Sequence, residues 1–293
     1  MGDPTSGVGT DLWANGVRIP NFIYGTAWKE NETERLTALA IATGFTGVDT
    51  ANQRRHYHEA GVGAGLARAF TAGRIQRQDL FLQTKFTYQA GQDHRLPYDP
   101  KADFATQVNQ SFESSLKHLH TDYLDSYGLH GPSVGTGLSN ADWEVWGAME
   151  ALVQEGKTKL LGVSNVNLGQ LQTLVSKASV RPAVVQNRCF SKLGWDKDVR
   201  AFCRDHEILY QGFSLLTANP EVFKHSGVQQ IARRVQRTPI QVVFRFSHRV
   251  GMIALTGTTN PNHMREDLMA DDFDLTNDDI RVIEEAGLHS PLN

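Results

Sequence analysis

Four side chains have the types that proton transfer to a carbonyl oxygen requires: Asp49, Tyr57, Lys85 and His130. A lysine ammonium beside a buried tyrosine is expected to lower the phenol pKa below about 10, because the positive charge favours the phenolate. Such a tyrosine can give its proton to a carbonyl oxygen near neutral pH. The aspartate would hold the lysine charged and oriented, and the histidine would donate to the same oxygen as charge develops on it. Reduction of the carbonyl also needs a hydride, which no side chain supplies, so the set implies a nicotinamide cofactor.

Each of these residues has a simpler structural explanation when it is taken alone. Asp49 could cap a helix or join a salt bridge, and Lys85 could be a solvated loop charge. Tyr57 lies in a polar stretch that could be surface loop, and His130 ends an apolar run, where a hydrogen-bonded core histidine is common. The hypothesis therefore depends on whether the fold brings the four side chains together.

Eight short apolar runs alternate with longer amphipathic segments along the chain. The runs, each expected to form a strand, are residues 22–24, 46–49, 80–84, 123–129, 159–163, 183–186, 208–213 and 252–256. Between them, apolar residues recur with the helical period in segments 102–120, 143–153, 168–175 and 240–246. Pro239 precedes the last of these segments and is expected to lie in the first turn of its helix.

This alternation is typical of a (β/α)8 TIM barrel, an α/β fold. We expect one domain over residues 1–293, with residues 1–15 as an N-terminal extension or a β-hairpin cap. An open doubly wound sheet is the alternative. The run Gly61-Val62-Gly63-Ala64-Gly65 lacks the G-x-G-x-x-G spacing and follows polar residues instead of a strand. We interpret its glycines as a tight turn into a helix, or as a close crossing of helices.

In a barrel of this type, the active site lies at the carboxyl ends of the strands. Asp49, Lys85 and His130 stand at the ends of the second, third and fourth expected strands, and Tyr57 lies in the loop after the second. The fifth, sixth and seventh expected strands end at polar or aromatic residues, which are Ser164-Asn165, Gln186 and Phe213-Ser214, respectively. This joint placement favours an active site over four unrelated structural roles.

Composition narrows the classes of partner. The 293 residues carry a net charge of −3, which offers no broad basic surface for nucleic acid or an anionic membrane. The chain has no apolar run of about 18 residues, so nothing in it is expected to span a bilayer. Its two cysteines, Cys189 and Cys203, form no C-x-x-C motif, and we therefore expect a reducing, cytoplasmic location without a structural zinc site.

Six ordered segments resemble the motifs of one family, the aldo-keto reductases, over nearly the whole chain. They are Gly25-Thr26-Ala27-Trp28, Gly47-Val48-Asp49-Thr50-Ala51, Gln83-Thr84-Lys85-Phe86, Asp122-Tyr123-Leu124-Asp125 leading to Leu129-His130-Gly131-Pro132, Gly156-Lys157 with Leu161-Gly162-Val163-Ser164-Asn165, and Arg181-Pro182-Ala183-Val184-Val185-Gln186. The resemblance implies reversible reduction of aldehydes and ketones to alcohols, with NADP(H) as the favoured cofactor and NAD(H) as the other possibility.

The resemblance also implies residue roles. Asp49, Tyr57, Lys85 and His130 would form the catalytic tetrad, with Tyr57 as the general acid. The implied cofactor residues are Gly25 and Thr26 at the first strand end; Ser164, Asn165 and Gln186 at the nicotinamide carboxamide; Phe213 on the nicotinamide ring; Ser214 and Leu216 along the pyrophosphate; and Gly257, Thr258, Thr259, His263, Arg265, Glu266 and Asp267 around the adenosine end.

Two features depart from the family pattern. The gap between Asp49 and Tyr57 is longer than the family's usual one, and His56 and His58 flank the tyrosine. Many relatives place a lysine and an arginine at the ribose 2′-phosphate, whereas Gly257 and His263 stand at those positions in this sequence. Arg265 is a candidate substitute, since a phosphate dianion needs charged partners.

We expect Trp28, Phe86 and Tyr88 to line the substrate pocket, and the substrate to be a small aldehyde, ketone or alcohol. A metal-dependent hydrolase is one alternative, since His56 and His58 form an H-x-H, but further converging ligands are not evident and we expect no metal. A non-catalytic, cofactor-binding redox sensor on the same scaffold is the other. The expected assembly is a monomer or a weak homo-oligomer.

Overall fold

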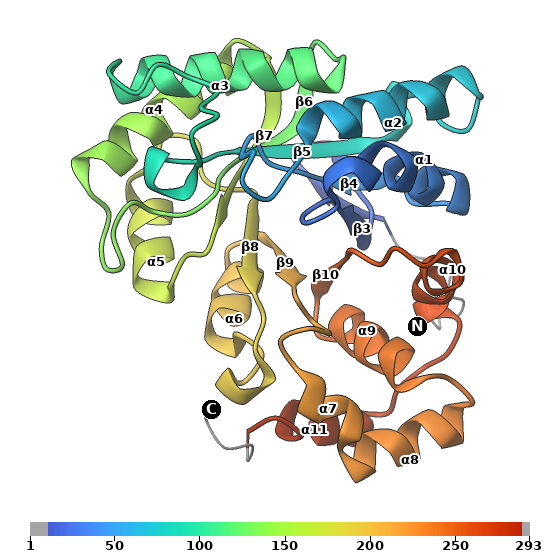
Figure 1. The fold of residues 1–293 in the computed structure, drawn as a ribbon. Coiled ribbons are helices and arrows are strands. Elements are labelled where there is room, and N and C mark those ends of the chain that lie inside the picture. Colours follow the sequence, from blue (N-terminus) through green and yellow to red (C-terminus); the bar gives the residue numbers. More distant parts are fainter. Residues whose placement is uncertain (1–10, 289–293) are drawn as a thin grey trace.

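The computed structural model describes residues 11–288, in which eight parallel strands close into a barrel (Figure 1). Around the barrel the order is β10-β3-β4-β5-β6-β7-β8-β9, with β10 pairing β3 to close it. The barrel strands are β3 (Phe22–Gly25), β4 (Gly47–Asp49), β5 (Phe81–Phe86), β6 (Leu124–Leu129), β7 (Thr158–Ser164), β8 (Val184–Arg188), β9 (Leu209–Phe213) and β10 (Met252–Thr256). All eight expected strands and the TIM-barrel fold are confirmed, and closure excludes the open doubly wound sheet.

Helices cover the outside of the barrel. They are α1 (Thr33–Thr43), α2 (Glu59–Thr71), α3 (Phe104–Leu119), α4 (Asn140–Gln154), α5 (Leu168–Lys177), α6 (Lys197–Asp205), α7 (Pro220–Lys224), α8 (Ser226–Val235), α9 (Pro239–Arg249), α10 (Pro261–Leu268) and α11 (Asn277–Glu285). Local sequence signals set where several of them begin. In α9, for example, the side chains of Thr238 and Gln241 form a capping box, and Pro239 occupies the first turn.

A hairpin closes the amino end of the barrel. Its strands, β1 (Leu12–Ala14) and β2 (Val17–Ile19), are antiparallel and joined by Asn15-Gly16, both with positive φ, as a two-residue hairpin turn requires. Val17 and Ile19 pack with inward-facing residues from the amino ends of the strands. The hairpin therefore extends beyond the expected bounds of 1–15, and residues 1–10 of that prediction lie outside the described residues.

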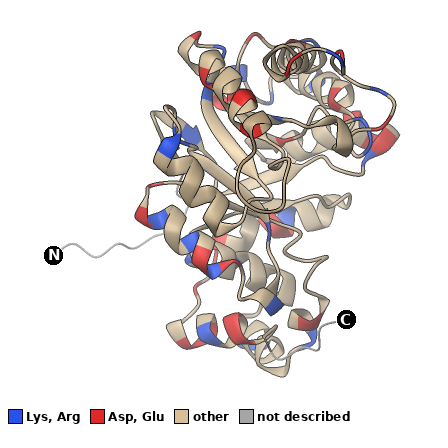
Figure 2. Ribbon diagram, turned by 90° about the vertical axis from the view of Figure 1, so that its left-hand side faces the viewer, with Lys and Arg blue, Asp and Glu red and all other residues tan. Residues whose placement is uncertain are grey.

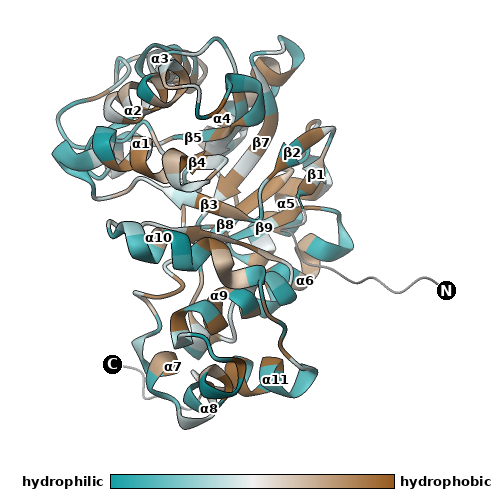
Figure 3. Cartoon of the chain, turned by 90° about the vertical axis from the view of Figure 1, so that its right-hand side faces the viewer, coloured by the Kyte–Doolittle hydropathy of each residue, from teal (hydrophilic) through white to brown (hydrophobic). Residues whose placement is uncertain are grey.

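Hydrophobic and charged residues separate as the barrel requires. Apolar positions concentrate on the strands and on the inner faces of the helices (Figure 3). Charged positions of both signs are interspersed on the helices and loops of the side seen in Figure 2. None of the helices within residues 11–288 is long and apolar enough to cross a membrane.

The glycines of 61–65 lie in α2 where it meets its neighbours. A Cβ on Gly65 would lie 2.6 Å from the Glu34 carbonyl oxygen of α1, and one on Gly63 would lie 1.9 Å from the His118 carbonyl oxygen of α3. The close helix crossing proposed for these residues is confirmed, and their role is to let α2 pack against both neighbours.

We expect Gly63→Ala to destabilise the fold by roughly 1–3 kcal/mol, because its methyl group would force α2 and α3 apart. The matched control is Gly147→Ala in α4, where a Cβ would meet open space and the alanine should stabilise the helix by about 0.5–1 kcal/mol. Urea denaturation measures both free energies. Equal midpoints for the two variants would contradict the packing explanation.

Candidate active site

The four candidate catalytic residues meet at the carboxyl end of the barrel. Asp49 ends β4, Lys85 lies within β5, and His130 directly follows β6. The ammonium of Lys85 lies 5.7 Å from the centre of the Tyr57 ring, and the rings of Tyr57 and His130 are 5.9 Å apart and nearly perpendicular. The fold therefore brings together the four side chains that the sequence separates by as many as 81 positions.

Lys85 and Asp49 form a buried ion pair at the centre of this group. Lys85 Nζ donates to Asp49 Oδ1 at 2.5 Å and to the Thr50 carbonyl oxygen at 2.9 Å, and both charged side chains are 4% exposed. Asp49 Oδ1 also accepts from Gln83 Nε2 at 2.6 Å and from Gln186 Nε2 at 2.9 Å. Such a buried pair is stable only when further hydrogen bonds satisfy its remaining groups, and the glutamines supply them.

The pKa of Tyr57 is raised above its ordinary value, first by burial and second by the negative charge of Asp49. The expectation of a lowered pKa is therefore wrong. Lys85 is the group that should lower it, but its charge is paired with Asp49, so its effect on the phenol is smaller than the opposing effects of burial and the Asp49 carboxylate. Tyr57 consequently holds its proton throughout the neutral range, as a proton donor must.

His130 is a neutral imidazole at this site. Burial, together with the positive charges of Lys85 and His56, lowers its pKa to about 3. Its backbone N–H donates to the Phe86 carbonyl oxygen at 2.9 Å, and its Nδ1 lies 2.7 Å from Thr87 Oγ1. A neutral imidazole carries one ring proton and can donate a hydrogen bond to a carbonyl oxygen.

We expect the single-turnover rate of carbonyl reduction to be independent of pH between about pH 6 and pH 9. The reason is that the Tyr57 pKa lies above this range and the His130 pKa of about 3 lies below it, so neither group changes protonation there. Rapid-mixing measurements across the range test this. A limb with an apparent pKa near 7 that disappears in Tyr57→Phe would contradict it.

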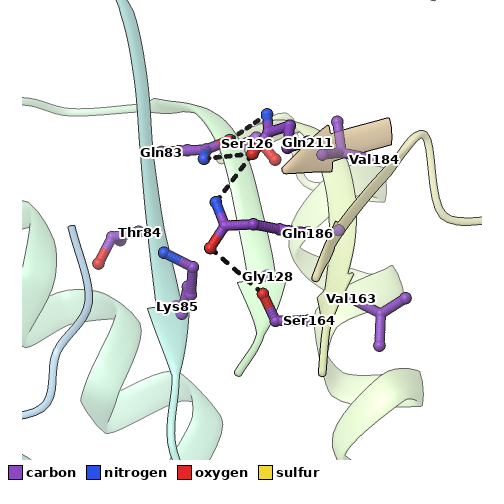
Figure 4. Close-up of a pocket in the computed structure, with 11 residues that line it drawn as sticks. Gln83, Thr84, Lys85, Ser126, Gly128, Val163, Ser164, Val184, Gln186 and Gln211 are labelled. Atoms are coloured by element: carbon purple, nitrogen blue, oxygen red, sulfur yellow. Dashed lines mark hydrogen bonds between the residues drawn. The ribbon is translucent and has the colours of Figure 1, made fainter. Parts of the chain in front are cut away.

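Beneath the ion pair, polar side chains line a small cavity inside the barrel (Figure 4). Gln211 Oε1 accepts from both Gln83 Nε2 and Gln186 Nε2 at 2.8 Å, and Ser164 Oγ donates to Gln186 Oε1 at 3.4 Å. Ser164 and Gln186 are direct neighbours in the β7–β8 pairing. Asn165 turns outward with positive φ and donates to the His130 carbonyl oxygen at 2.8 Å. Ser164, Asn165 and Gln186 thus lie together beside His130.

The residues at the end of β9 adjoin this group. Phe213 is half-buried, and its ring lies 5.6 Å from the guanidinium of Arg188, its register partner on β8. Ser214 follows with positive φ, and the backbone carbonyls of Ser214 and Leu216 accept from the next turn. These residues form a half-buried rim beside Gln186.

The residues expected around an adenosine end lie after β10, but they do not share one environment. The side chains of His263, Arg265 and Glu266 are exposed on α10, and Gly257, Thr258 and Thr259 form the loop before that helix. Asp267 instead is buried, accepts from Thr256 Oγ1 at 2.8 Å, and has its pKa raised by burial to about 6. Asp267 is thus held against β10 by Thr256, and its assignment to the adenosine end stays a prediction.

The end of β3 contributes one residue that sequence reasoning overlooked. The Lys29 ammonium donates to the Gly257 carbonyl oxygen, and a Cβ on Gly257 would lie 3.3 Å from Lys29 Nζ. Burial lowers the pKa of Lys29.

Gly25 lies at the end of the strand, whereas Thr26 is fully buried and donates to the Asp49 carbonyl oxygen at 2.8 Å. The Thr26 side chain therefore supports the strand end, and its assignment to the cofactor site stays a prediction.

Of the expected pocket residues, only Trp28 lies at the mouth of the site. It is 66% exposed and its ring stacks on His56 at 4.0 Å. Phe86 is 0% exposed because the strand alternation that turns Lys85 inward turns Phe86 outward against Tyr98. The Tyr88 hydroxyl donates to Asp142 at 2.8 Å. Phe86 and Tyr88 are thus packing residues, which corrects their assignment to the pocket wall.

The H-x-H of 56–58 is not assembled as a metal site in this structure. His56 stacks on Trp28, and His58 Nδ1 lies 3.3 Å from the Glu30 carbonyl oxygen. Within residues 11–288, no three histidine, cysteine or acidic side chains gather closely enough to hold a metal ion.

Comparison with known proteins agrees with this geometry. The family model described as "Aldo/keto reductase family" matches residues 12–219, more than two thirds of the chain. The chain belongs to the aldo/keto reductase family. As a member of it, the chain is an oxidoreductase that reduces carbonyl groups, and the predicted family is confirmed.

Individual relatives of this aldo-keto reductase span almost its whole length. An oxidoreductase of Bacillus subtilis, YtbE, is 30% identical over 273 residues, which are 92% of this chain and 90% of the relative. A glyoxal reductase of the same organism is 28% identical, covering 96% of this chain and 94% of its own. The crystal structure of an aldo/keto reductase from Brucella melitensis superposes with a TM-score of 0.78 at 26% identity, covering 93% and 96% of the two chains.

Proposed function

We propose that this aldo-keto reductase reduces small aldehydes and ketones reversibly, with NADP(H) as the favoured hydride carrier and Tyr57 as the proton donor. One observation carries the assignment of residues: the protonated Tyr57 lies between the buried Lys85–Asp49 pair and the neutral His130. No other group of described residues combines a proton donor, a buried cation and a neutral hydrogen-bond donor at the carboxyl ends of the strands.

The four residues divide the chemistry among them. When bound, the nicotinamide supplies the hydride. His130 donates a hydrogen bond that orients the carbonyl oxygen, and Tyr57 gives up its proton as the oxygen gains charge. A raised phenol pKa does not prevent this step, because an alkoxide is a stronger base than a phenolate. Lys85 stabilises the phenolate that remains, and Asp49 keeps Lys85 charged and in place.

The residues present fit such a cofactor. Gln186 Oε1 has only the long 3.4 Å contact from Ser164, so it remains an acceptor for a carboxamide N–H group. Phe213 offers a half-buried aromatic face beside it. At the expected adenosine end of the cofactor site, Gly257 has no side chain, and the ammonium of Lys29 lies in the space that a side chain at position 257 would need. We propose that Lys29 provides the cation for the cofactor phosphates that position 257 does not.

We expect Lys29→Ala to weaken NADPH binding by roughly ten- to a hundredfold, the effect of losing a hydrogen bond to a charged group, and to weaken NADH binding less. His263→Ala/Arg265→Ala is expected to act in the same direction. Fluorescence titration measures both dissociation constants, with exposed Lys177→Ala as the control. Equal losses for NADPH and NADH would contradict a role at the 2′-phosphate.

A turnover assay tests the function itself. Purified protein is given NADPH or NADH and a panel of carbonyl compounds that includes glyoxal, an aromatic aldehyde and a simple ketone, and oxidation of the cofactor is followed. We expect turnover, faster with NADPH. Tight cofactor binding with no turnover on any carbonyl would favour the non-catalytic sensor instead.

We also propose that the enzyme is cytoplasmic and is a monomer or a weak homo-oligomer. Both cysteines are buried free thiols, as a reducing compartment permits. Sedimentation over a range of concentrations tests the assembly, and a tight, concentration-independent oligomer would contradict it.

A further inference from the structure

The loop after β5 places a hydroxyl group against the catalytic histidine. Thr87 is the first residue after β5 and follows Lys85 by two positions, so continuing the alternation of the strand by one residue directs both side chains toward the site. The Thr87 side chain is buried, with 6% of the residue exposed, and its Oγ1 lies 2.7 Å from His130 Nδ1. The spacing of two residues from Lys85 indicates this direction of the Thr87 side chain in the sequence. A threonine, however, is not a residue type that by itself suggests a role in catalysis.

The direction of this hydrogen bond follows from the partners of the hydroxyl. Thr87 Oγ1 has no other hydrogen-bond partner among residues 11–288. If Nδ1–H were the donor, the buried hydroxyl proton would have no acceptor, and an unsatisfied buried donor is unfavourable. If the hydroxyl is the donor, its proton is satisfied and Nδ1 is the acceptor.

This direction determines which nitrogen of His130 carries the proton. The low pKa keeps the ring neutral, so an accepting Nδ1 leaves the single ring proton on Nε2. Within residues 11–288, Nε2 has no hydrogen-bond acceptor. The opposite tautomer would present a lone pair at Nε2, which would repel a carbonyl oxygen.

The surrounding loop holds Thr87 in this orientation. Its carbonyl oxygen accepts from the Tyr98 hydroxyl at 2.8 Å, and its methyl group is close to Gly91, where a Cβ would lie 2.7 Å from Thr87 Cγ2. The same loop is joined to the segment before Tyr57, because Gln53 Nε2 donates to the Gly91 carbonyl oxygen at 2.8 Å. With its methyl group packed against Gly91, Thr87 turns its hydroxyl toward His130.

We propose that Thr87 is a positioning residue that fixes His130 in the Nε2-protonated tautomer, so that His130 presents a donor to the carbonyl oxygen. This inference rests on the proposed function for its effect on catalysis. The tautomer itself is a property of the protein without cofactor or substrate.

The test is NMR of the imidazole nitrogens in protein labelled with ¹⁵N-histidine, with no cofactor or substrate added and with His130→Asn to assign the signals. We expect an unprotonated Nδ1 and a protonated Nε2 in the wild type. Thr87→Ser, which keeps the hydroxyl, should retain this pattern. Thr87→Val, which replaces the hydroxyl with a methyl group, should give a mixture of tautomers and about a tenfold lower kcat.

The control is Thr37→Val in α1, which removes a buried hydroxyl that has no partner in the described chain. We expect it to leave both the tautomer and kcat unchanged. A protonated Nδ1 in the wild type would overturn the proposal without any variant, and so would a Thr87→Val protein with the wild-type tautomer or the wild-type kcat. Failure of the proposed function would appear separately, as an absence of carbonyl turnover in the wild type.

Discussion

Tyr57→Phe is expected to lower kcat for carbonyl reduction by about 10²–10⁴-fold, the range typical of general acid catalysis. The variant removes the proton donor and leaves the ring in place against His130. Because the phenol proton takes part only in the chemical step, the dissociation constant of NADPH should change little. Steady-state kinetics and a cofactor titration on the same preparation measure the two quantities.

The matched control is Tyr123→Phe, whose hydroxyl makes only a 3.5 Å contact with the Arg77 carbonyl oxygen near the start of β6. It should retain the wild-type kcat. His56 flanks Tyr57 and stacks on Trp28, so His56→Ala tests the assignment of the acid. Wild-type kcat in Tyr57→Phe together with its loss in His56→Ala would show that the wrong residue has been assigned.

The second large effect is expected for Lys85→Met, which should reduce both stability and turnover. It leaves the Asp49 carboxylate buried with only two glutamine amides as partners. Breaking a buried ion pair in this way typically costs about 3–5 kcal/mol of folding free energy. Urea denaturation measures the loss, and kcat should fall because the phenolate is no longer stabilised.

A control variant and a double variant distinguish the effect of losing the buried ion pair from a general effect of replacing a lysine. Lys157→Met breaks an exposed pair with Glu155 and should cost no more than about 1 kcal/mol. Asp49→Asn/Lys85→Met should cost less than the sum of the two single variants, since no isolated charge remains buried. Additive losses would mean that the two side chains do not act as a pair.

Much of the fold was predictable because it depends on local patterns. The eight strands follow from short apolar runs between polar segments, and helix starts such as Thr238-Pro239 carry their own capping signals. The gathering of Asp49, Lys85 and His130 followed from the barrel itself, since the ends of its parallel strands meet at one rim. Strand alternation also predicts that the Phe86 side chain points outward, and its assignment to the pocket wall did not take this into account.

The remaining features depend on contacts between distant segments. The sign of the Tyr57 pKa shift depends on how deeply the phenol is buried and on whether Asp49 neutralises Lys85, and neither can be read from spacing. Lys29 reaches Gly257 across 228 positions, from a loop in which Trp28 has positive φ, an uncommon conformation for a tryptophan. The burial of Asp267 likewise follows from its hydrogen bond to Thr256 on β10.

The most direct test of the account follows the hydride and the proton in one reaction. Wild-type and Tyr57→Phe proteins are given a carbonyl substrate and NADPH that carries deuterium at the transferred position, and the alcohol is analysed by mass spectrometry. We predict that the wild type forms an alcohol labelled on its carbinol carbon, and that Tyr57→Phe forms it about 10²–10⁴ times more slowly while it still binds NADPH. An unlabelled product, or labelled product formed by Tyr57→Phe at the wild-type rate, would contradict the account.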